Sequence, residues 1–203
     1  MILKSDIVYE RLQAEDETKL VIQPIDIEEL KNSGSSSVDM RLGTRFLSTK
    51  HSRCTILDIE AEDKDINKEK RLMESHYVPF GKSFILHPRD FVLGVTLEWI
   101  KLPYDLSGYV QGRSSWGRRG LVIATAVGVH SGFSGCLTLE ITNLGEVPIA
   151  IYPGMTICQL FLHKVHTSIQ TSDSTTFFGK SKPVLGRILL DKTARKLAGF
   201  KTT

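Results

Sequence analysis

The segment Gly135-Cys136-Leu137-Thr138-Leu139-Glu140-Ile141-Thr142-Asn143 alternates between polar and apolar side chains. Successive side chains of a β-strand point to opposite faces, so this period of two predicts a strand with one face of leucine and isoleucine. The other face carries Cys136, Thr138, Glu140 and Thr142. A carboxylate between two threonines in mid-strand suits a polar pocket, where it can accept and return a proton. The alternative is an exposed face at a sheet edge.

Short strand-like runs continue on both sides of this segment. They cover residues 20–22, 38–47, 77–80, 83–87, 91–100, 106–111, 121–126, 147–151 and 156–162. Turn residues such as Pro88, Pro103 and Gly132 separate them. Many short strands with turns about every eight to twelve residues predict an all-β barrel or a double-sheet jelly roll. Before them, Ser5 as N-cap and an apolar stripe at helical spacing predict a short helix over residues 6–14.

Length and composition are those of an ordinary globular chain. The 203 residues are 41% hydrophobic and 24% charged, with a net charge of +3. This length predicts one compact domain, over residues 1–166, with an appended arm over residues 167–203. The chain has no apolar run of the about 20 residues that span a bilayer and no secretory signal, so we expect a cytoplasmic protein without a membrane partner. The small net charge argues against nucleic-acid binding.

The cysteine and histidine spacings predict no metal site and no disulfide framework. Cys54, Cys136 and Cys158 lie far apart and form no C-x-x-C pair. In addition, no histidine is followed two positions later by glutamate, as the zinc deaminases require. His163 and His166 lack a supporting cluster, which favours surface or packing roles. We therefore expect no zinc.

A second polar segment, GRSSWGRRG at residues 112–120, follows the strand predicted over 106–111. Ser114 and Ser115 stand where a helix of one or two turns can begin, and a helix N-terminus offers free N–H groups to an anion. Arg113 and Arg118 add full positive charge, so the segment predicts a phosphate site. The alternative is a serine-capped helix with a solvated basic face. The usual phosphate loops, G-x-x-x-x-G-K-[ST] and G-x-G-x-x-G, are absent.

Several further motifs follow one another along the chain: SSVDMRLG at 36–43, FVLGVTLE at 91–98, GRSS at 112–115, GFSG at 132–135 followed by Glu140, and the run 153–160. Taken together and in this order, they resemble the deoxycytidine triphosphate deaminase branch of the trimeric dUTPase superfamily. The resemblance implies a distorted jelly roll, or β-clip barrel, with a short N-terminal helix and a short helix after the Arg-Ser-Ser motif. It also implies a homotrimer with sites between subunits and a C-terminal arm that closes over dCTP. Mg²⁺ would be carried by the triphosphate oxygens.

The resemblance further implies a role for individual residues. Glu140 would be the general acid/base for attack of water on carbon 4 of cytosine. Ser114 and Arg118 would orient that water and polarise the base, and Arg113 and Ser115 would engage the phosphates. The other nucleotide-binding residues implied are Trp116, Gly117, Ala126, His130, Thr138, Leu139, Gln159, Phe177 and Lys180.

Two departures from the family pattern leave three functions open. His130 replaces the Asp of an A-x-x-I-D pattern, which readies the attacking water in dUTPases and contacts the sugar 3′-hydroxyl in deaminases. The arm motif K-Y-x-G-Q reads TFFGK here, at residues 176–180. The leading hypothesis is a monofunctional deaminase that converts dCTP to dUTP and ammonia. The alternatives are a bifunctional enzyme that goes on to dUMP and a non-catalytic nucleotide-binding homologue.

Overall fold

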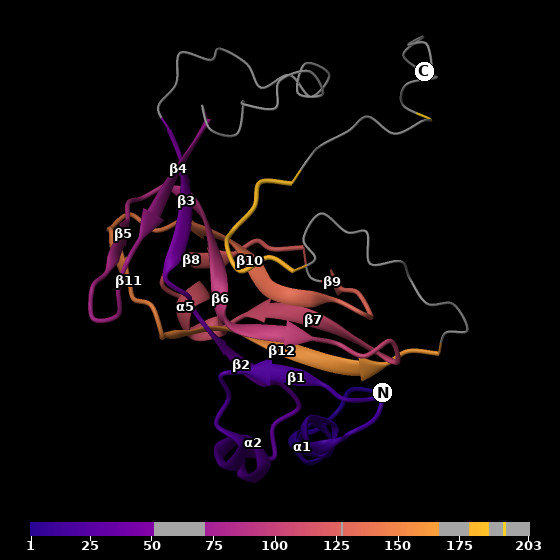
Figure 1. Cartoon of the computed structure of the whole chain (residues 1–203). Helices are drawn as coiled ribbons and strands as arrows, with labels where there is room; N and C mark the ends of the chain where they lie inside the picture. Colours follow the sequence, from indigo (N-terminus) through magenta and orange to yellow (C-terminus); the bar gives the residue numbers. More distant parts are fainter. Residues whose placement is uncertain (51–71, 127, 167–178, 187–192, 194–203) are drawn as a thin grey trace. The chain divides into compact units, whose positions relative to one another are not determined.

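The computed structural model describes residues 1–50, 72–126, 128–166, 179–186 and 193 (Figure 1). The chain divides into two compact units, Met1–Ser48 with Ser75–Val184 and Thr49–Glu74 with Leu185–Thr203. Most of the second unit lies outside the described residues; within it the N–H of Lys50 donates to the carbonyl of Leu72 at 2.7 Å. The predicted division into 1–166 and 167–203 stays a prediction, because most of residues 167–203 also lie outside the described residues.

Within the described ranges the helices are short. They are α1 (Ser5–Gln13), α2 (Ile27–Ser33) and α5 (Ser114–Gly117). The predicted N-terminal helix is therefore present, but Ser5 is its first residue, 3% exposed, and the N-cap Lys4 makes no side-chain capping bond. None of the described helices has the length and apolar character needed to cross a membrane.

Helix α2 was not predicted, although its two ends carry recognisable signals. The side chain of Asp26 accepts a hydrogen bond from the N–H of Glu29 at 2.9 Å, which caps the first turn. Gly34 follows the last turn with φ 61°, the left-handed conformation that ends many helices. Figure 1 shows α1 and α2 next to each other, beside β1 and β2.

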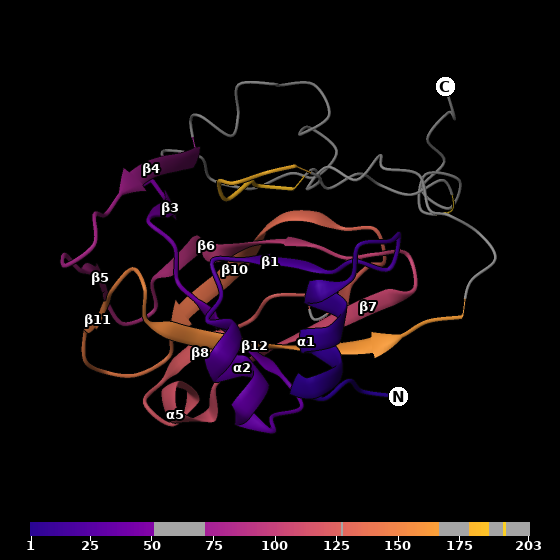
Figure 2. The ribbon, with the colours of Figure 1, turned by 60° about the horizontal axis from the view of Figure 1, so that its bottom comes forward.

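The described strands account for most of the fold. They are β1 (Val21–Gln23), β2 (Val38–Arg41), β3 (Arg45–Thr49), β4 (Met73–Tyr77), β5 (Phe84–Leu86), β6 (Phe91–Lys101), β7 (Leu106–Gly112), β8 (Leu121–Ile123), β9 (Gly128–Val129), β10 (Ser134–Asn143), β11 (Ile149–Ile151) and β12 (Thr156–Lys164). One sheet has the order β4-β3-β6-β10-β8, with β1 also paired to β6. A second has the order β2-β12-β7-β9, and β11 pairs with β5 (Figure 2). The predicted all-β fold class is confirmed.

The alternation in β10 sets one face of this strand into the core. Leu137, Leu139 and Ile141 are 7%, 0% and 0% exposed, whereas Thr138 and Glu140 are only partly buried. Buried side chains of β10 and β6 join those of β7 and β12 in one hydrophobic cluster. The cluster removes apolar surface from water on the inner faces of both sheets, which leaves the polar face of β10 available for chemistry.

The strand predictions differ from the structure mainly at their boundaries. The run 38–47 becomes two strands, β2 and β3, because the chain bends at Gly43, whose N–H donates to the carbonyl of Val95 at 2.8 Å. A Cβ on Gly43 would lie 3.1 Å from that carbonyl oxygen, so a side chain has little room there. Residues 78–80 lie beyond the end of β4, and β9 is too short to show a period.

Candidate active site

Glu140 lies in β10, between β6 and the end of β8. It pairs with Leu93 of β6 on one side. On the other side its N–H donates to the hydroxyl of Thr125 at 2.8 Å, and its carbonyl accepts from the N–H of Ala124 at 2.8 Å. These bonds tie the backbone of Glu140 to the residues that follow β8. They fix the backbone position from which the Glu140 side chain extends on the partly exposed face of β10.

Residues 179 and 180 bind the same edge of β10 nearer the beginning of the strand. The N–H of Cys136 donates to the carbonyl of Lys180 at 2.8 Å, and the N–H of Gly179 donates to the carbonyl of Ser134 at 2.7 Å. Backbone groups of alternate residues in an antiparallel strand face the same edge. The backbone N–H and carbonyl of Thr138 therefore face the same edge of β10, between the contact of Glu140 with Thr125 and the contact of Cys136 with Lys180. The structure thus brings Thr138, Glu140 and Lys180 to one edge.

Cys136 shares the polar face of β10 with Glu140. Burial raises the pKa of its thiol, and the nearby carboxylate of Glu98 raises it further, so the thiol stays protonated at neutral pH. A protonated thiol is a poor nucleophile.

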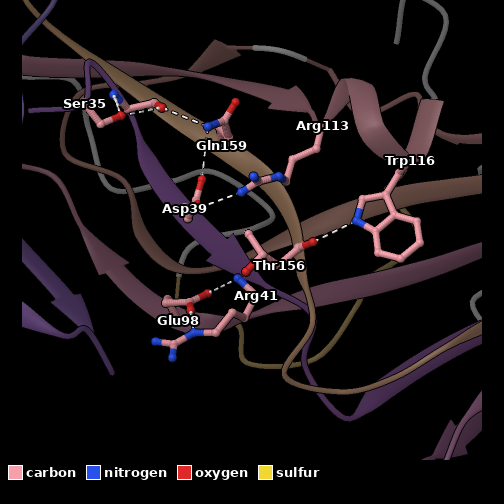
Figure 3. A network of polar contacts seen from close by, with 9 residues as sticks. Ser35, Asp39, Arg41, Glu98, Arg113, Trp116, Thr156 and Gln159 are labelled. Atoms are coloured by element: carbon pink, nitrogen blue, oxygen red, sulfur yellow. Dashed lines mark hydrogen bonds and ion pairs between the residues drawn. The ribbon is translucent and has the colours of Figure 1, made fainter. Parts of the chain in front are cut away.

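Arg113, the residue before α5, takes part in a polar network on the second sheet (Figure 3). Its guanidinium donates to one oxygen of Asp39 at 2.5 Å, and the amide of Gln159 donates to the other at 3.0 Å. The Gln159 amide also lies 3.2 Å from the hydroxyl of Ser37. The Asp39 side chain is 50% exposed, so a cation and an amide donor converge on a carboxylate at the surface. An incoming anion can compete with that carboxylate for both donors.

Helix α5 is anchored to the sheet by its tryptophan. The indole N–H of Trp116 donates to the carbonyl of Thr156 at 2.9 Å, and Figure 3 shows the side chain reaching from α5 toward β12. Ser114 and Ser115 are exposed, and no side chain caps the helix. The predicted short helix is thus confirmed. No serine caps it, because Ser114 lies inside the first turn, but the solvated basic face of the alternative agrees with the structure. Arg118 is also exposed, at the other end of the helix.

The network around Arg113 and the strand position of Glu140 are connected through three packed residues. Gly112 precedes Arg113, and a Cβ on Gly112 would lie 3.3 Å from the Cβ of Ile123. Ile123 pairs with Ile141, the residue after Glu140. The close approach at Gly112 therefore sets β7 and α5 directly against the pair β8 and β10. Arg113 and Glu140 are each one residue away from this contact.

The remaining predicted site residues are less closely tied to Glu140. Ala126 and His130 are exposed, in the segment that joins β8 to β10 through β9. The N–H of Phe133 donates to the carbonyl of His130 at 3.2 Å. The side chain of Leu139 is fully buried, so any contact of Leu139 with a nucleotide would involve its backbone. Gly117 is exposed in α5, and Phe177 lies outside the described residues. Nucleotide binding by all of these residues stays a prediction.

Two residues at the site were missed by sequence reasoning. Asp39 holds Arg113 and Gln159 together, and Thr125 supports the backbone of Glu140. A signal existed for Asp39, which is exposed between the buried Val38 and Met40 and belongs to the motif at 36–43. Thr125 had no local signal, because its partner is 15 residues away in the sequence.

The described residues also include side chains of the types that could form a metal site. They contain no group of three or more His, Cys, Asp and Glu side chains that could hold one. The predicted absence of zinc stays a prediction. Mg²⁺ needs few protein ligands when phosphate oxygens and water supply most of its shell. Asp39, beside Arg113, is a carboxylate of the type that can share such a shell, and the magnesium ion stays a prediction.

The family described as dCTP deaminase-like matches residues 5–165. The chain belongs to this family. A protein of Dictyoglomus thermophilum named "dCTP deaminase, dUMP-forming" is 40% identical over 181 residues, which are 87% of this chain and 90% of that protein. A Dictyoglomus turgidum protein of the same name is 46% identical over 157 residues, 77% of this chain and 78% of the relative. A Natronomonas pharaonis protein named "dCTP deaminase" is 35% identical over 197 residues, 95% and 97% of the two chains.

A solved structure agrees with this membership at the level of the fold. The crystal structure of 2′-deoxycytidine 5′-triphosphate deaminase from Agrobacterium tumefaciens matches with a TM-score of 0.58 at 20% identity. The match covers 81% of this chain but 48% of that chain, so this protein spans about half the length of that relative. The family resemblance predicted from the sequence is confirmed.

Proposed function

We propose that this dCTP deaminase-like protein is a hydrolase that removes the amino group of dCTP as ammonia. The observation that carries the proposal is the position of Glu140, fixed by Thr125 on the polar face of β10 and one residue from the contact that leads to Arg113. The names of the relatives from Dictyoglomus and Natronomonas support the same reaction.

In the proposed reaction Glu140 takes a proton from water while the water oxygen bonds to carbon 4 of cytosine. Glu140 passes that proton to ring nitrogen 3, which carries a hydrogen in uracil. It then takes the proton of the new hydroxyl group and gives it to the amino nitrogen, so that the C–N bond breaks and ammonia leaves as the carbonyl of uracil forms. The backbone groups of Thr138 supply a donor and an acceptor at the adjacent edge for the base. Ser114 and Arg118 orient the water and polarise the base, a role that their exposed positions in α5 leave open to them.

The triphosphate takes the place of Asp39 as a partner of Arg113 and Gln159. A triphosphate carries more charge than one carboxylate, and guanidinium pairs with phosphate oxygens in a fork geometry. The hydroxyl of Ser115 is exposed close by. Bound Mg²⁺ would neutralise part of the phosphate charge, and Asp39 is the residue that would hold its water shell.

Arg113→Ala is expected to raise the KM for dCTP about 10- to 100-fold, with a smaller change in kcat. A charge-assisted hydrogen bond contributes about 1.5–3 kcal/mol, and about 1.4 kcal/mol corresponds to a factor of ten. Steady-state ammonia release checks this. Arg119→Ala is the matched control, because the Arg119 guanidinium is bound to the carbonyl of Ser115 at 2.7 Å. A KM for Arg113→Ala equal to that of the control would contradict phosphate binding.

The complete site is proposed to need more than one copy of the chain and its C-terminal arm. The family resemblance supports a homotrimer with sites between subunits. The contacts of Gly179 and Lys180 with β10 bring part of the arm to the strand that carries Glu140. Lys180 is exposed there and can supply a positive charge to the nucleotide.

The experiment that tests the function is incubation of purified protein with dCTP and magnesium. Ammonia, dUTP, dUMP and pyrophosphate are followed in the same sample. Ammonia release supports the proposed deaminase whichever nucleotide accompanies it. Binding of dCTP without ammonia release over many enzyme equivalents would overturn it in favour of a non-catalytic nucleotide-binding protein.

A second candidate function is further hydrolysis of dUTP to dUMP and pyrophosphate. It is favoured by the name "dUMP-forming" of both Dictyoglomus relatives and of a Methanobrevibacter smithii protein that is 38% identical over 187 residues. These names favour dUMP over the dUTP product of the leading sequence-based hypothesis. The appearance of pyrophosphate together with ammonia tests it.

His130→Asp is expected to raise pyrophosphate release relative to ammonia release, while ammonia release stays equal or improves. The carboxylate restores a group able to ready water near the phosphates, and an acceptor for the sugar hydroxyl is retained. His166→Asp is the control, because His166 is equally exposed but lies beyond β12. A severe loss of ammonia release confined to His130→Asp would show instead that the imidazole has its own role.

A further inference from the structure

Strand β6 contains a bulge opposite Leu137, close to the proposed proton acceptor. Cys136 pairs with Trp99 and Thr138 pairs with Val95, so two steps along β10 correspond to four along β6. Thr96, Leu97 and Glu98 are the β6 residues between these two pairs. A bulge interrupts the regular ladder and reorients the side chains on either side of it.

The hydroxyl of Thr96 closes the gap that the bulge leaves in the ladder. Its oxygen accepts from the N–H of Leu137 at 3.0 Å and donates to the carbonyl of Glu98 at 2.9 Å. Thr96 is 1% exposed, so water is not at hand to replace either bond. One side chain therefore satisfies a backbone donor of β10 and a backbone acceptor of β6.

The other end of the bulge is tied to β2 by a buried carboxylate. Glu98, 1% exposed, accepts from the N–H of Arg41 at 2.9 Å and from its guanidinium at 2.7 Å (Figure 3). The same guanidinium donates to the carbonyl of Pro24 at 3.0 Å. Two residues before Arg41, Asp39 holds Arg113 and Gln159. The bulge therefore lies between β2, which carries Asp39, and β10, which carries Glu140.

We infer that Thr96 is a positioning residue for deamination, which fixes the strand that carries Thr138 and Glu140 against the strand that carries Asp39. This inference rests on the proposed function. Leu137 directly precedes Thr138, so loss of its acceptor lets this part of β10 shift or twist relative to β6. A shift of about 1 Å in a reacting group can cost about 10²-fold in rate. The phosphate donors are outside β10, so substrate binding is affected less than turnover.

The test is Thr96→Val, which keeps the branched shape but removes the hydroxyl, compared with Thr96→Ser, which keeps the hydroxyl. We expect Thr96→Val to lower kcat about 10- to 100-fold with little change in the KM for dCTP. Thr96→Ser is expected to restore kcat to near the wild-type value. Ser107→Ala is the control, because it removes a partly buried hydrogen bond, from the Ser107 hydroxyl to the carbonyl of Val129 at 2.8 Å, that does not involve β10.

A purely structural role would lower the melting temperature of Thr96→Val without lowering kcat per folded molecule, and that result would overturn the inference. Equal kcat values for the valine and serine variants would also overturn it. If Thr96→Val does not fold, Thr96→Ala and Thr96→Ser are compared at a temperature at which both are folded.

Hydrogen exchange separates this inference from the proposed function. If wild-type protein releases no ammonia, the proposed function fails. The positioning of β10 is then judged from the exchange of the Leu137 and Leu139 amides in Thr96→Val, because Leu139 pairs with Gly94 of β6. Faster exchange there, with the Gly108 amide of β7 unchanged, supports control of β10 by Thr96. Unchanged exchange at Leu137 overturns it.

Discussion

Glu140→Gln is expected to lower the kcat for ammonia release by about 10²- to 10⁴-fold, the range attributed to a positioned general acid/base. The glutamine amide has the size of the carboxylate but cannot take a proton from water. The backbone bonds of Glu140 to Thr125 and Ala124 do not involve the side chain, so the fold should be retained. Coupled ammonia assays measure the rate, and calorimetric titration with dCTP measures binding, which we expect to change little.

The control for this substitution is Glu146→Gln, which removes an exposed carboxylate in the turn after β10. It should leave both ammonia release and dCTP affinity unchanged. A Glu140→Gln protein that keeps more than about a tenth of the wild-type kcat would contradict the assignment of the proton acceptor. Loss of dCTP binding together with loss of the melting transition would instead indicate unfolding.

Gly120→Ala is expected to lower the free energy of unfolding by about 2–6 kcal/mol, from backbone strain plus overpacking. Gly120 has φ 87°, which L side chains rarely adopt. A Cβ at this position would lie 2.6 Å from the N and 2.8 Å from the Cα of Gly145, and backbone atoms cannot move aside as a flexible side chain can. Denaturant unfolding followed by fluorescence measures the loss.

Gly117→Ala is the matched control from the same segment. Gly117 has no atom within 4 Å of a built Cβ and lies in helix α5, where alanine is favoured over glycine by up to about 1 kcal/mol. Its stability should be equal to wild type or slightly higher. Equal stability of the two alanine variants would contradict this prediction. It would show that the backbone between α5 and β8 can shift to accept a side chain at Gly120.

The parts of the fold that could be predicted are those whose pattern is local and repeated. The alternation in β10 was readable because each side chain there is either in the core or on the polar face. Helix α5 was readable because Ser114 and Ser115 follow a strand and a glycine. Glu140 and Arg113 stood out as candidates for the same reason, since each lies in a short segment of unusual composition.

The parts that could not be predicted depend on residues distant in sequence. The ion pair of Arg113 with Asp39 joins positions 74 residues apart, and the bond from Leu137 to Thr96 joins positions 41 apart. Neither leaves a trace in the pattern of hydrophobic residues. Helix α2 was missed because its capping aspartate and final glycine bracket a stretch with only one buried side chain, Leu30, and hence no stripe.

The contact of Gly179 and Lys180 with β10 also matters for how chains meet one another. A strand with open N–H and C=O groups is a template onto which another protein's strand can add, and this is a common route to aggregation. The bonds from Gly179 to Ser134 and from Cys136 to Lys180 occupy part of that edge with the chain's own backbone. The strand that carries Glu140 thus has part of its edge protected against unwanted strand addition by backbone of the same chain.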